Sequence, residues 1–124
     1  MELDFTSSRP IYSQIIHQFS KAVARGDLAP GDRVPSQREL AEQAKVNPNT
    51  VQRAYREMEQ MELVETLRGQ GTFITNRPDL LDKLRSELAA QAVKAFLDEM
   101  NSLGLKGEDV VRMVQEGFGG DDHV

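Results

Sequence analysis

The stretch of residues 35–61 constrains the fold of this chain more than any other part of its sequence. It reads PSQRELAEQAKVNPNTVQRAYREMEQM and contains two helix start signals close together. Ser36 and Glu39 have the spacing of a capping box, in which each side chain satisfies a free backbone N–H group. Asn47 followed by Pro48 is a second start, because asparagine caps helices and proline suits the first helical position. The stretch therefore predicts two short helices joined by a tight turn.

The second of these helices is predicted to have an apolar face and a polar face. Apolar residues recur at helical spacing, namely Val51, Ala54, Tyr55, Met58 and Met61. Roughly opposite them lie Asn49, Arg53, Arg56 and Gln60. In a DNA major groove arginine pairs with guanine, and asparagine or glutamine pairs with adenine. The polar face therefore suits the reading of a duplex, although a merely solvated face explains the helix alone equally well.

The segments on either side complete a recognisable order of elements. Residues 63–67 and 72–75 have the composition of two short strands, and the glycine-rich turn RGQG stands between them. Residues 10–24 carry apolar side chains at helical spacing, which predicts a first helix packed behind the other two. Residues 27–35 are expected to form a turn-rich connector. The expected fold class is mainly α with a small β wing, a winged helix-turn-helix domain.

Four motifs in this region carry a family resemblance. They are LAPGDRVPS at 28–36, RELA at 38–41, NPNTV at 47–51 and RGQGTF at 68–73. With these motifs in this order, the run from Pro10 to Ile74 resembles the DNA-binding domain of the GntR family of bacterial transcription regulators. The wording VNPNTVQRAYREME and the short C-terminal part are most similar to the YtrA-type subfamily. Lys45 departs from the usual pattern, since the turn often carries glycine, and a positive φ at lysine costs about 1 kcal/mol.

The resemblance, together with the helical geometry, implies a sequence-specific regulator that binds double-stranded DNA and represses by covering a promoter. Base edges would be contacted by Asn47, Asn49, Thr50 and Arg53, with Gln52 on the flank. Phosphates would be held by Ser36 and Arg38, and the wing would enter the minor groove with Arg68 and Gly69, next to Gln70. The subfamily resemblance suggests, by analogy, control of a neighbouring transporter operon. The operator sequence, the regulated genes and a small-molecule effector are not identified by the sequence.

The residues after Pro78 are expected to form a separate helical part. Helices are predicted over 79–103 and 108–118, followed by a frayed polar end, so the expected domains are 1–77 and 78–124. Two helices of this size lack a core of their own, and a two-fold symmetric reader gains from a palindromic operator. The resemblance also implies a homodimer formed by these helices. The expected dimerisation stripe consists of Leu81, Leu84, Leu88, Phe96 and Met100, and packing within one chain is the alternative.

The charge of the chain is divided unevenly between these two parts. Residues 1–77 hold ten basic and ten acidic side chains, whereas residues 78–124 hold five basic and ten acidic ones. The net charge of −5 therefore belongs to the C-terminal part. A neutral DNA-binding part disfavours strong non-specific binding, which depends on phosphate neutralisation. Binding would require cations gathered on one face, and the candidates are Arg38, Lys45, Arg53, Arg56 and Arg68.

Other function classes find little support in the sequence. The chain has no cysteine, and no pairing of a nucleophile with a base is recognisable, so an enzyme is not expected. No metal site or cofactor is expected, because Asp121, Asp122 and His123 are better explained as a polar tail. No leader or long apolar run is recognisable, so a cytoplasmic protein without membrane contact is expected. The main alternative is a winged helix that docks on another protein without binding DNA.

Overall fold

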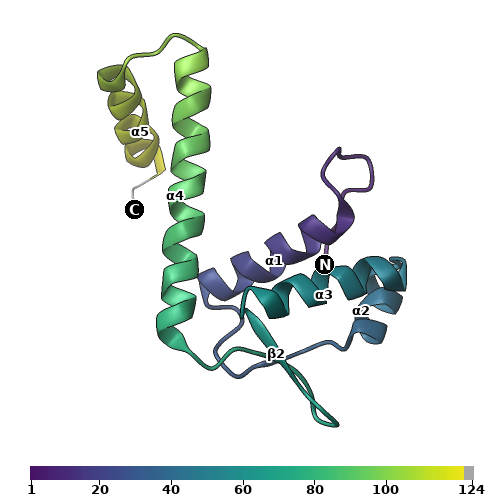
Figure 1. The fold of residues 1–124 in the computed structure, drawn as a ribbon. Coiled ribbons are helices and arrows are strands. Elements are labelled where there is room, and N and C mark those ends of the chain that lie inside the picture. Colours follow the sequence, from purple (N-terminus) through teal and green to yellow (C-terminus); the bar gives the residue numbers. More distant parts are fainter. Residues whose placement is uncertain (122–124) are drawn as a thin grey trace. The chain divides into compact units, whose positions relative to one another are not determined.

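A computed structural model describes residues 1–121 of the chain (Figure 1). The chain forms two compact units, Met1–Ser86 and a second one from Glu87 onward. The change between them falls inside one continuous helix, and a domain boundary after residue 77 stays a prediction. In chain order the elements are α1 (Ile11–Arg25), β1 (Arg33–Val34), α2 (Gln37–Ala44), α3 (Pro48–Gln60), β2 (Val64–Leu67), β3 (Gly71–Ile74), α4 (Pro78–Ser102) and α5 (Gly107–Asp121).

Both predicted helix starts are confirmed. The hydroxyl of Ser36 accepts a hydrogen bond from the backbone N–H of Glu39 at 3.1 Å, and the Glu39 carboxylate accepts one from the Ser36 N–H at 2.8 Å. This capping box begins α2. Asn47 caps α3 through its Oδ1 atom, which accepts from the N–H of Asn49 at 2.8 Å, and Pro48 is the first helical residue. Local hydrogen bonding in the sequence thus determines where both helices begin.

The turn between α2 and α3 is made at Lys45. This residue has a φ of 56° and a ψ of 50°, the left-handed conformation that ends many helices, and its N–H bonds the carbonyl of Ala41. The sequence therefore meets the need for a positive φ without glycine, at a cost of about 1 kcal/mol. The turn directs the chain so that α2 and α3 pack as a helix-turn-helix.

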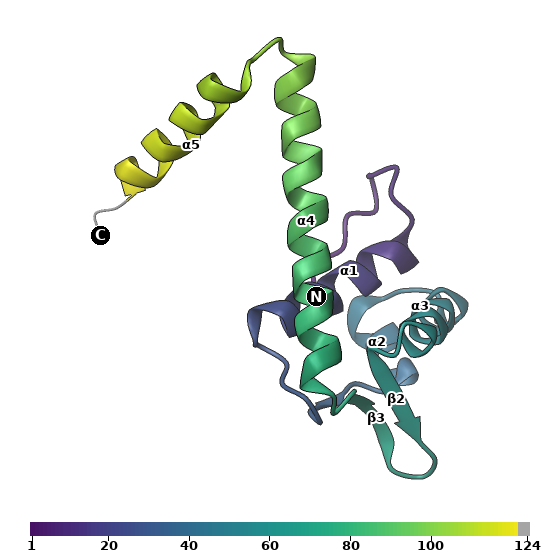
Figure 2. The same cartoon turned by 60° about the vertical axis from the view of Figure 1, so that its left-hand side comes forward.

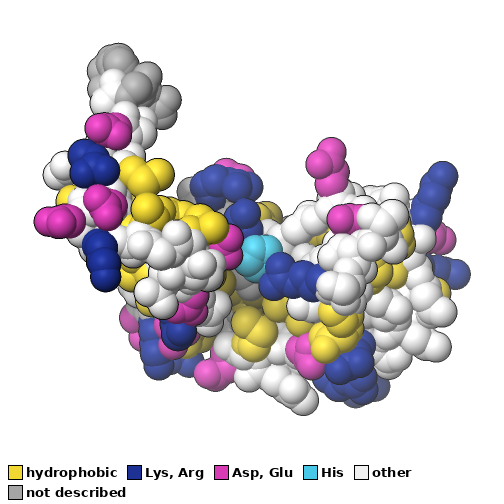
Figure 3. All heavy atoms as spheres, turned by 90° about the horizontal axis from the view of Figure 1, so that it is seen from above, with side chains coloured by type: hydrophobic (Ala, Val, Ile, Leu, Met, Phe, Trp, Pro, Cys, Tyr) yellow, Lys and Arg dark blue, Asp and Glu magenta, His cyan; other side chains and the backbone are white. Residues whose placement is uncertain are grey.

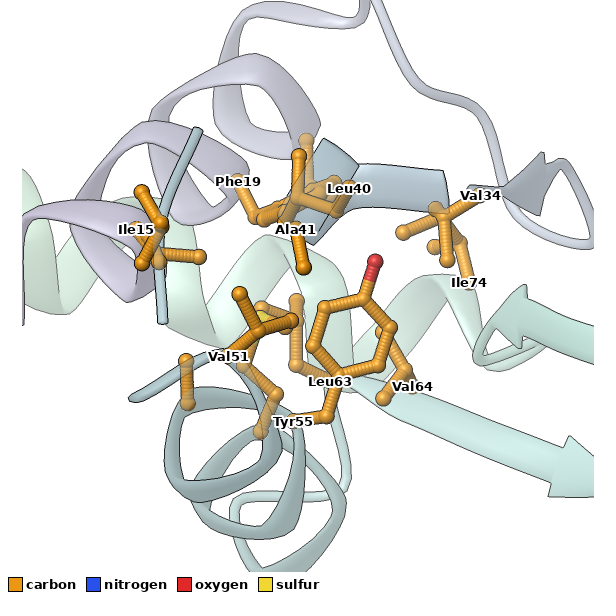
Figure 4. Close-up of a cluster of buried hydrophobic side chains, with 14 of the residues drawn as sticks. Ile15, Phe19, Val34, Leu40, Ala41, Val51, Tyr55, Leu63, Val64 and Ile74 are labelled. Atoms are coloured by element: carbon orange, nitrogen blue, oxygen red, sulfur yellow. The ribbon is translucent and has the colours of Figure 1, made fainter. Parts of the chain in front are cut away.

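The apolar core of the first unit lies between α1, α2, α3 and the sheet (Figure 4). Val51 and Tyr55 of α3 point into it, and the rings of Phe19 and Tyr55 meet edge to face with centroids 6.1 Å apart. Met61 was expected in this apolar face, but it is 44% exposed. The correction has a simple reason, because Met61 is the C-cap residue that follows Gln60 and lies at the edge of the apolar face, beyond the last buried turn of α3.

A three-stranded antiparallel sheet completes the unit, in the order β1–β3–β2. β2 and β3 form the predicted hairpin, in which Val64 pairs with Ile74. β1 was expected to be part of a connector, and this expectation is wrong, since Arg33 pairs with Phe73. A strand of two residues is too short to show an alternating pattern in the sequence. The hairpin leaves the helical body as a wing (Figures 1 and 2).

The second unit contains the later turns of α4 and the helix α5. After α4 the chain changes direction in the turn 103–106, and α5 follows. The two helices diverge from that turn (Figure 2). Within the described part of this unit the one buried hydrophobic side chain is Val110. Hydrophobic side chains stand exposed on its surface (Figure 3), among them Val93, Phe96, Leu97, Leu103, Val111, Met113, Val114 and Phe118.

The end of α5 and the start of α4 differ from the expectations. α5 continues to Asp121, so residues 119–121 are helical rather than frayed, and residues 122–124 lie outside the described part. Leu81 is buried in the core of the first unit and Leu84 packs against it, although both were assigned to a contact between two copies. No helix in the described residues is long and apolar enough to cross a membrane.

Candidate nucleic-acid interface

The outer face of α3 is built from polar side chains on a buried back. Val51, Ala54 and Met58 are each 0% exposed, whereas the side chains opposite them reach solvent. The exposed residues of this face are Asn49, Gln52, Arg53, Arg56 and Gln60. The face therefore presents amides and guanidinium groups, the side chains that pair with purine edges in a major groove.

Tyr55 holds α3 in place from the buried side. Its hydroxyl donates a 2.6 Å hydrogen bond to the carbonyl of Pro35, which lies just before α2. Burial, with a smaller contribution from the negative charge of Glu39, raises the pKa of Tyr55 well above its ordinary value, so the hydroxyl stays protonated and donates. The outer helix is thus fixed to the start of α2, and their two sets of polar side chains keep one relative position.

A groove of about 470 Å³ runs between α2 and α3. Its polar lining consists of Gln37, Arg38, Glu42, Asn49 and Gln52. The groove brings together three residues that the sequence assigned separately to phosphate and base contacts, Arg38, Asn49 and Gln52. Glu42 adds a carboxylate to the same groove, which repels phosphate and favours donors such as the amino group of cytosine.

Two of the expected contact residues already use part of their hydrogen-bonding capacity within the fold. The Ser36 oxygen accepts from Glu39, which leaves its hydroxyl hydrogen to donate. These hydrogen bonds, first the one from the Ser36 backbone, lower the pKa of Glu39, so its carboxylate stays charged in the cap. The Asn47 Oδ1 atom caps α3, which leaves the amide NH₂ as its outward group. Thr50, in the first turn of α3, is half-buried.

Arg53 makes a contact that the sequence did not indicate. Its guanidinium carbon lies 3.8 Å from the centroid of the Tyr12 ring, on α1. Tyr12 is half-buried and packs against the apolar core. The pairing depends on how α1 crosses α3, which the spacing of residues within one helix does not reveal.

The wing carries Arg68, Gly69 and Gln70 at its tip, and all three are exposed. The backbone N–H of Gln70 bonds the carbonyl of Leu67 at 2.8 Å, which closes the turn, and Gly69 supplies a φ of 78°. The tip lies on a different element from the groove between α2 and α3. The structure thus divides the expected contacts between a helical face and a hairpin.

Arg33 is a cation of this region that the sequence reasoning missed. It lies on β1 next to β3, and a Cβ atom added at Gly71 would come within 2.8 Å of its Nε atom. Its guanidinium group therefore lies against the backbone of Gly71, directly after the turn at the tip of the wing. The sequence alone holds no usable signal for this position, because the pairing of residues 33 and 73 becomes visible only once β1 is recognised.

The described residues contain no group of three or more histidine or acidic side chains that could hold a metal ion. Asp122 and His123, two members of the polar tail considered in the sequence, lie outside the described part of the chain. The expected contact residues present hydrogen-bond donors on the outer face of α3 and at the tip of the wing, an arrangement that suits binding.

A helix-turn-helix with a polar outer helix and an adjoining β wing defines a protein of the winged-helix DNA-binding class. Residues 11–74 match the family described as bacterial regulatory proteins of the gntR family. The chain therefore belongs to the GntR family, and it is a helix-turn-helix transcription regulator.

Two relatives from Bacillus subtilis (strain 168) match nearly the whole chain. The uncharacterized HTH-type transcriptional regulator YhcF is 45% identical over 115 residues, which cover 93% of this chain and 95% of the relative. The HTH-type transcriptional repressor YtrA is 37% identical over 117 residues, covering 94% and 90%. The resemblance to the YtrA-type subfamily is confirmed by this second match.

Two solved structures support the same fold. A GntR family transcriptional regulator from Listeria monocytogenes has a TM-score of 0.84 and 38% identity, covering 90% of this chain and 98% of that one. The DNA-binding domain of AraR in complex with operator ORE1 has a TM-score of 0.52 and 26% identity, covering 60% and 90%. The expected winged helix-turn-helix is therefore confirmed.

Proposed function

We propose that this regulator binds a palindromic operator duplex as a homodimer and represses transcription by covering a promoter. The observation that carries the proposal is the outer face of α3, where exposed Asn49, Gln52 and Arg53 stand on a completely buried back. A rigid polar helix of this kind fits the major groove, with its first residues toward the bases. The repressing direction rests on the name of the relative YtrA.

The proposed contacts fall into three groups. Asn47, Asn49, Thr50 and Arg53 read base edges, with Gln52 on the flank. Ser36 and Arg38 hold phosphates from the start of α2. The wing reaches the minor groove with its tip, Arg68, Gly69 and Gln70. The AraR domain with its operator supports a duplex as the ligand of such a fold.

The proposed homodimer is supported by the second unit. Phe96 is 40% exposed and Phe118 is 73% exposed, and an exposed apolar patch of this kind is typical of an interaction site. The half-buried Leu88 and Met100 lie on the same long helix as Phe96. Leu81 and Leu84 stay within their own chain and anchor the start of that helix. A two-fold dimer would present two reading helices to two half-sites.

Selection of bound sequences from a random duplex pool tests the DNA-binding part. We expect a palindromic consensus, and affinity that falls steeply as salt rises, because phosphate contacts release counterions. The absence of duplex binding at low salt would favour the alternative of a protein-docking winged helix. Whether the neighbouring operon encodes a transporter, as analogy with the subfamily suggests, is tested by locating that consensus in the source genome.

Sedimentation tests the homodimer separately from DNA binding. We expect a dimer at micromolar concentration in the absence of DNA. A monomer that stays monomeric when a palindromic duplex is added would contradict the dimer and leave the DNA-binding proposal standing.

A further inference from the structure

Tyr12 of α1 and Arg53 of α3 form a contact across two helices that the sequence places far apart. The guanidinium carbon of Arg53 lies 3.8 Å from the centroid of the Tyr12 ring. Carbon atoms in van der Waals contact are separated by about 3.5–4.0 Å, so the group touches the ring. A cation over an aromatic face is also attracted by the quadrupole of the ring.

The ring is a fixed platform and the arginine is the adaptable partner. Tyr12 is half-buried and packs against the core cluster, while Arg53 is exposed on the outer face of α3. Tyrosine has two side-chain torsions, whereas arginine is rich in rotamers and loses much entropy when it is ordered. A contact already present in the free protein removes part of that loss from DNA binding.

The contact leaves the hydrogen-bonding groups of Arg53 available. A cation–π contact uses the flat face of the guanidinium group, and its five N–H donors lie in the plane of that group. Asn49 stands one helical turn before Arg53 on the same exposed face. Stacking on Tyr12 is therefore compatible with a bidentate contact to a guanine beside the base pair that Asn49 meets.

We propose that Tyr12 is a positioning residue for DNA recognition, because its ring holds Arg53 in the orientation in which its donors meet the duplex. The inference rests on the function proposed above and adds a residue of α1 to the reading of one base pair. The opposite arrangement, in which the ring withholds Arg53 from DNA, would make removal of the ring strengthen binding.

The test compares Tyr12→Leu, Tyr12→Phe, Arg53→Ala and the Tyr12→Leu/Arg53→Ala double variant on a duplex that the wild type selects from a random pool. We expect Tyr12→Leu to bind about three- to tenfold more weakly, because the ordering of one rotamer-rich side chain then has to take place on binding. Tyr12→Phe keeps the ring and should bind like the wild type. The double variant should bind no more weakly than Arg53→Ala alone.

The double-variant comparison separates positioning from a structural role. Equal losses from Tyr12→Leu with and without Arg53 would overturn the inference, and so would unchanged or tighter binding by Tyr12→Leu. Failure of the wild type to bind any duplex at low salt would instead refute the proposed function. Thermal unfolding of each variant shows whether it keeps its fold.

A measurement on the wild type makes the test independent of any variant. The ring current of Tyr12 should shield the Arg53 Nε–H proton, and NMR should show the shielded resonance both in the free protein and in the complex with the selected duplex. A shielded resonance that moves to an ordinary arginine position on DNA binding would overturn the inference, because the ring would then release Arg53.

Discussion

The two compact units of the chain place their apolar residues in opposite ways. In the described residues, every buried hydrophobic side chain except Val110 belongs to the unit Met1–Ser86. Most of the large exposed hydrophobic side chains belong to the unit that begins at Glu87. The first unit therefore has what an independently stable domain needs, and the second has the surface expected of a segment that requires a partner.

The two units also differ in how their polar and charged side chains are held. The first unit places its amides and guanidinium groups on defined elements, since Ser36, Asn47 and Tyr55 each make hydrogen bonds that fix a helix. The charged groups of the second unit make local surface pairs, such as Lys94 with Asp98 at 3.0 Å. Pairs of that kind contribute little to stability. The comparison supports the proposal that the first unit recognises DNA and that the second unit joins two copies.

The largest effect is expected from placing a charge on the exposed apolar surface of the second unit. Phe96→Asp would put an unpaired ion into the proposed contact between two copies, which costs several kcal/mol. Sedimentation should show a monomer, and binding to a palindromic duplex should lose its cooperativity. Gln91→Asp adds the same charge to an exposed polar position of α4 and should stay dimeric. Loss of the dimer in both variants would point to net charge as the cause.

A matched pair of methionines tests the contrast in packing. Met58→Ala removes a side chain that is 0% exposed in the first unit, and should lower the free energy of unfolding by about 2–5 kcal/mol. Met113→Ala removes one that is 47% exposed in the second unit, and should change it by no more than about 0.5 kcal/mol in the monomer. Urea unfolding at concentrations too low for dimers gives both values. Similar losses would mean that α5 packs in solution more closely than the structure describes.

Much of the first unit could be predicted because its signals are local. The capping box at Ser36 and the cap at Asn47 involve residues two or three positions apart, and the turn residues around Gly69 lie between two short strands. Lys45 shows that even a residue with an unfavourable φ follows the turn when the helices on both sides pack. The apolar and polar faces of α3 were predictable up to Gln60, where the helix ends.

The parts that could not be predicted depend on contacts between distant residues. β1 consists of two residues and exists because β3 pairs with it. The stack of Arg53 on Tyr12 requires the crossing of α1 and α3. Leu81 and Leu88 belong to one apolar stripe in the sequence, yet Leu81 is buried in the winged core while Leu88 is half-buried further along α4. Because α4 is one continuous helix that belongs to two units, its sequence shows a single apolar stripe. The stripe does not reveal which of its residues are buried in the first unit.

A smaller effect is expected at the two glycines of the wing, which test whether the recognising unit depends on the shape of its hairpin. Both have a positive φ, 78° at Gly69 and 130° at Gly71, so alanine is strained at either position by about 1–2 kcal/mol. At Gly71 the added carbon also meets Arg33, at 2.8 Å from its Nε atom, whereas at Gly69 it meets nothing within 4 Å. Gly71→Ala should therefore weaken duplex binding and lower the melting temperature more than Gly69→Ala does. Equal effects would show that Arg33 moves aside at no cost.

The smallest effect concerns single cations, one from each unit. Arg68 is exposed at the tip of the wing and Lys94 is exposed on α4. If the wing enters the minor groove, Arg68→Ala removes one cation that displaces counterions from the duplex, and the slope of log affinity against log salt should fall by about one unit. Lys94→Ala changes the net charge of the protein by the same amount at a place where no DNA contact is proposed. Its slope should match that of the wild type, because long-range effects of one exposed charge are screened beyond about 10 Å at 0.1 M salt.

Titrations of one selected duplex over a series of salt concentrations measure both slopes. Equal slopes for the two variants would mean that Arg68 acts through net charge alone, and the wing would then no longer count as part of the recognising surface.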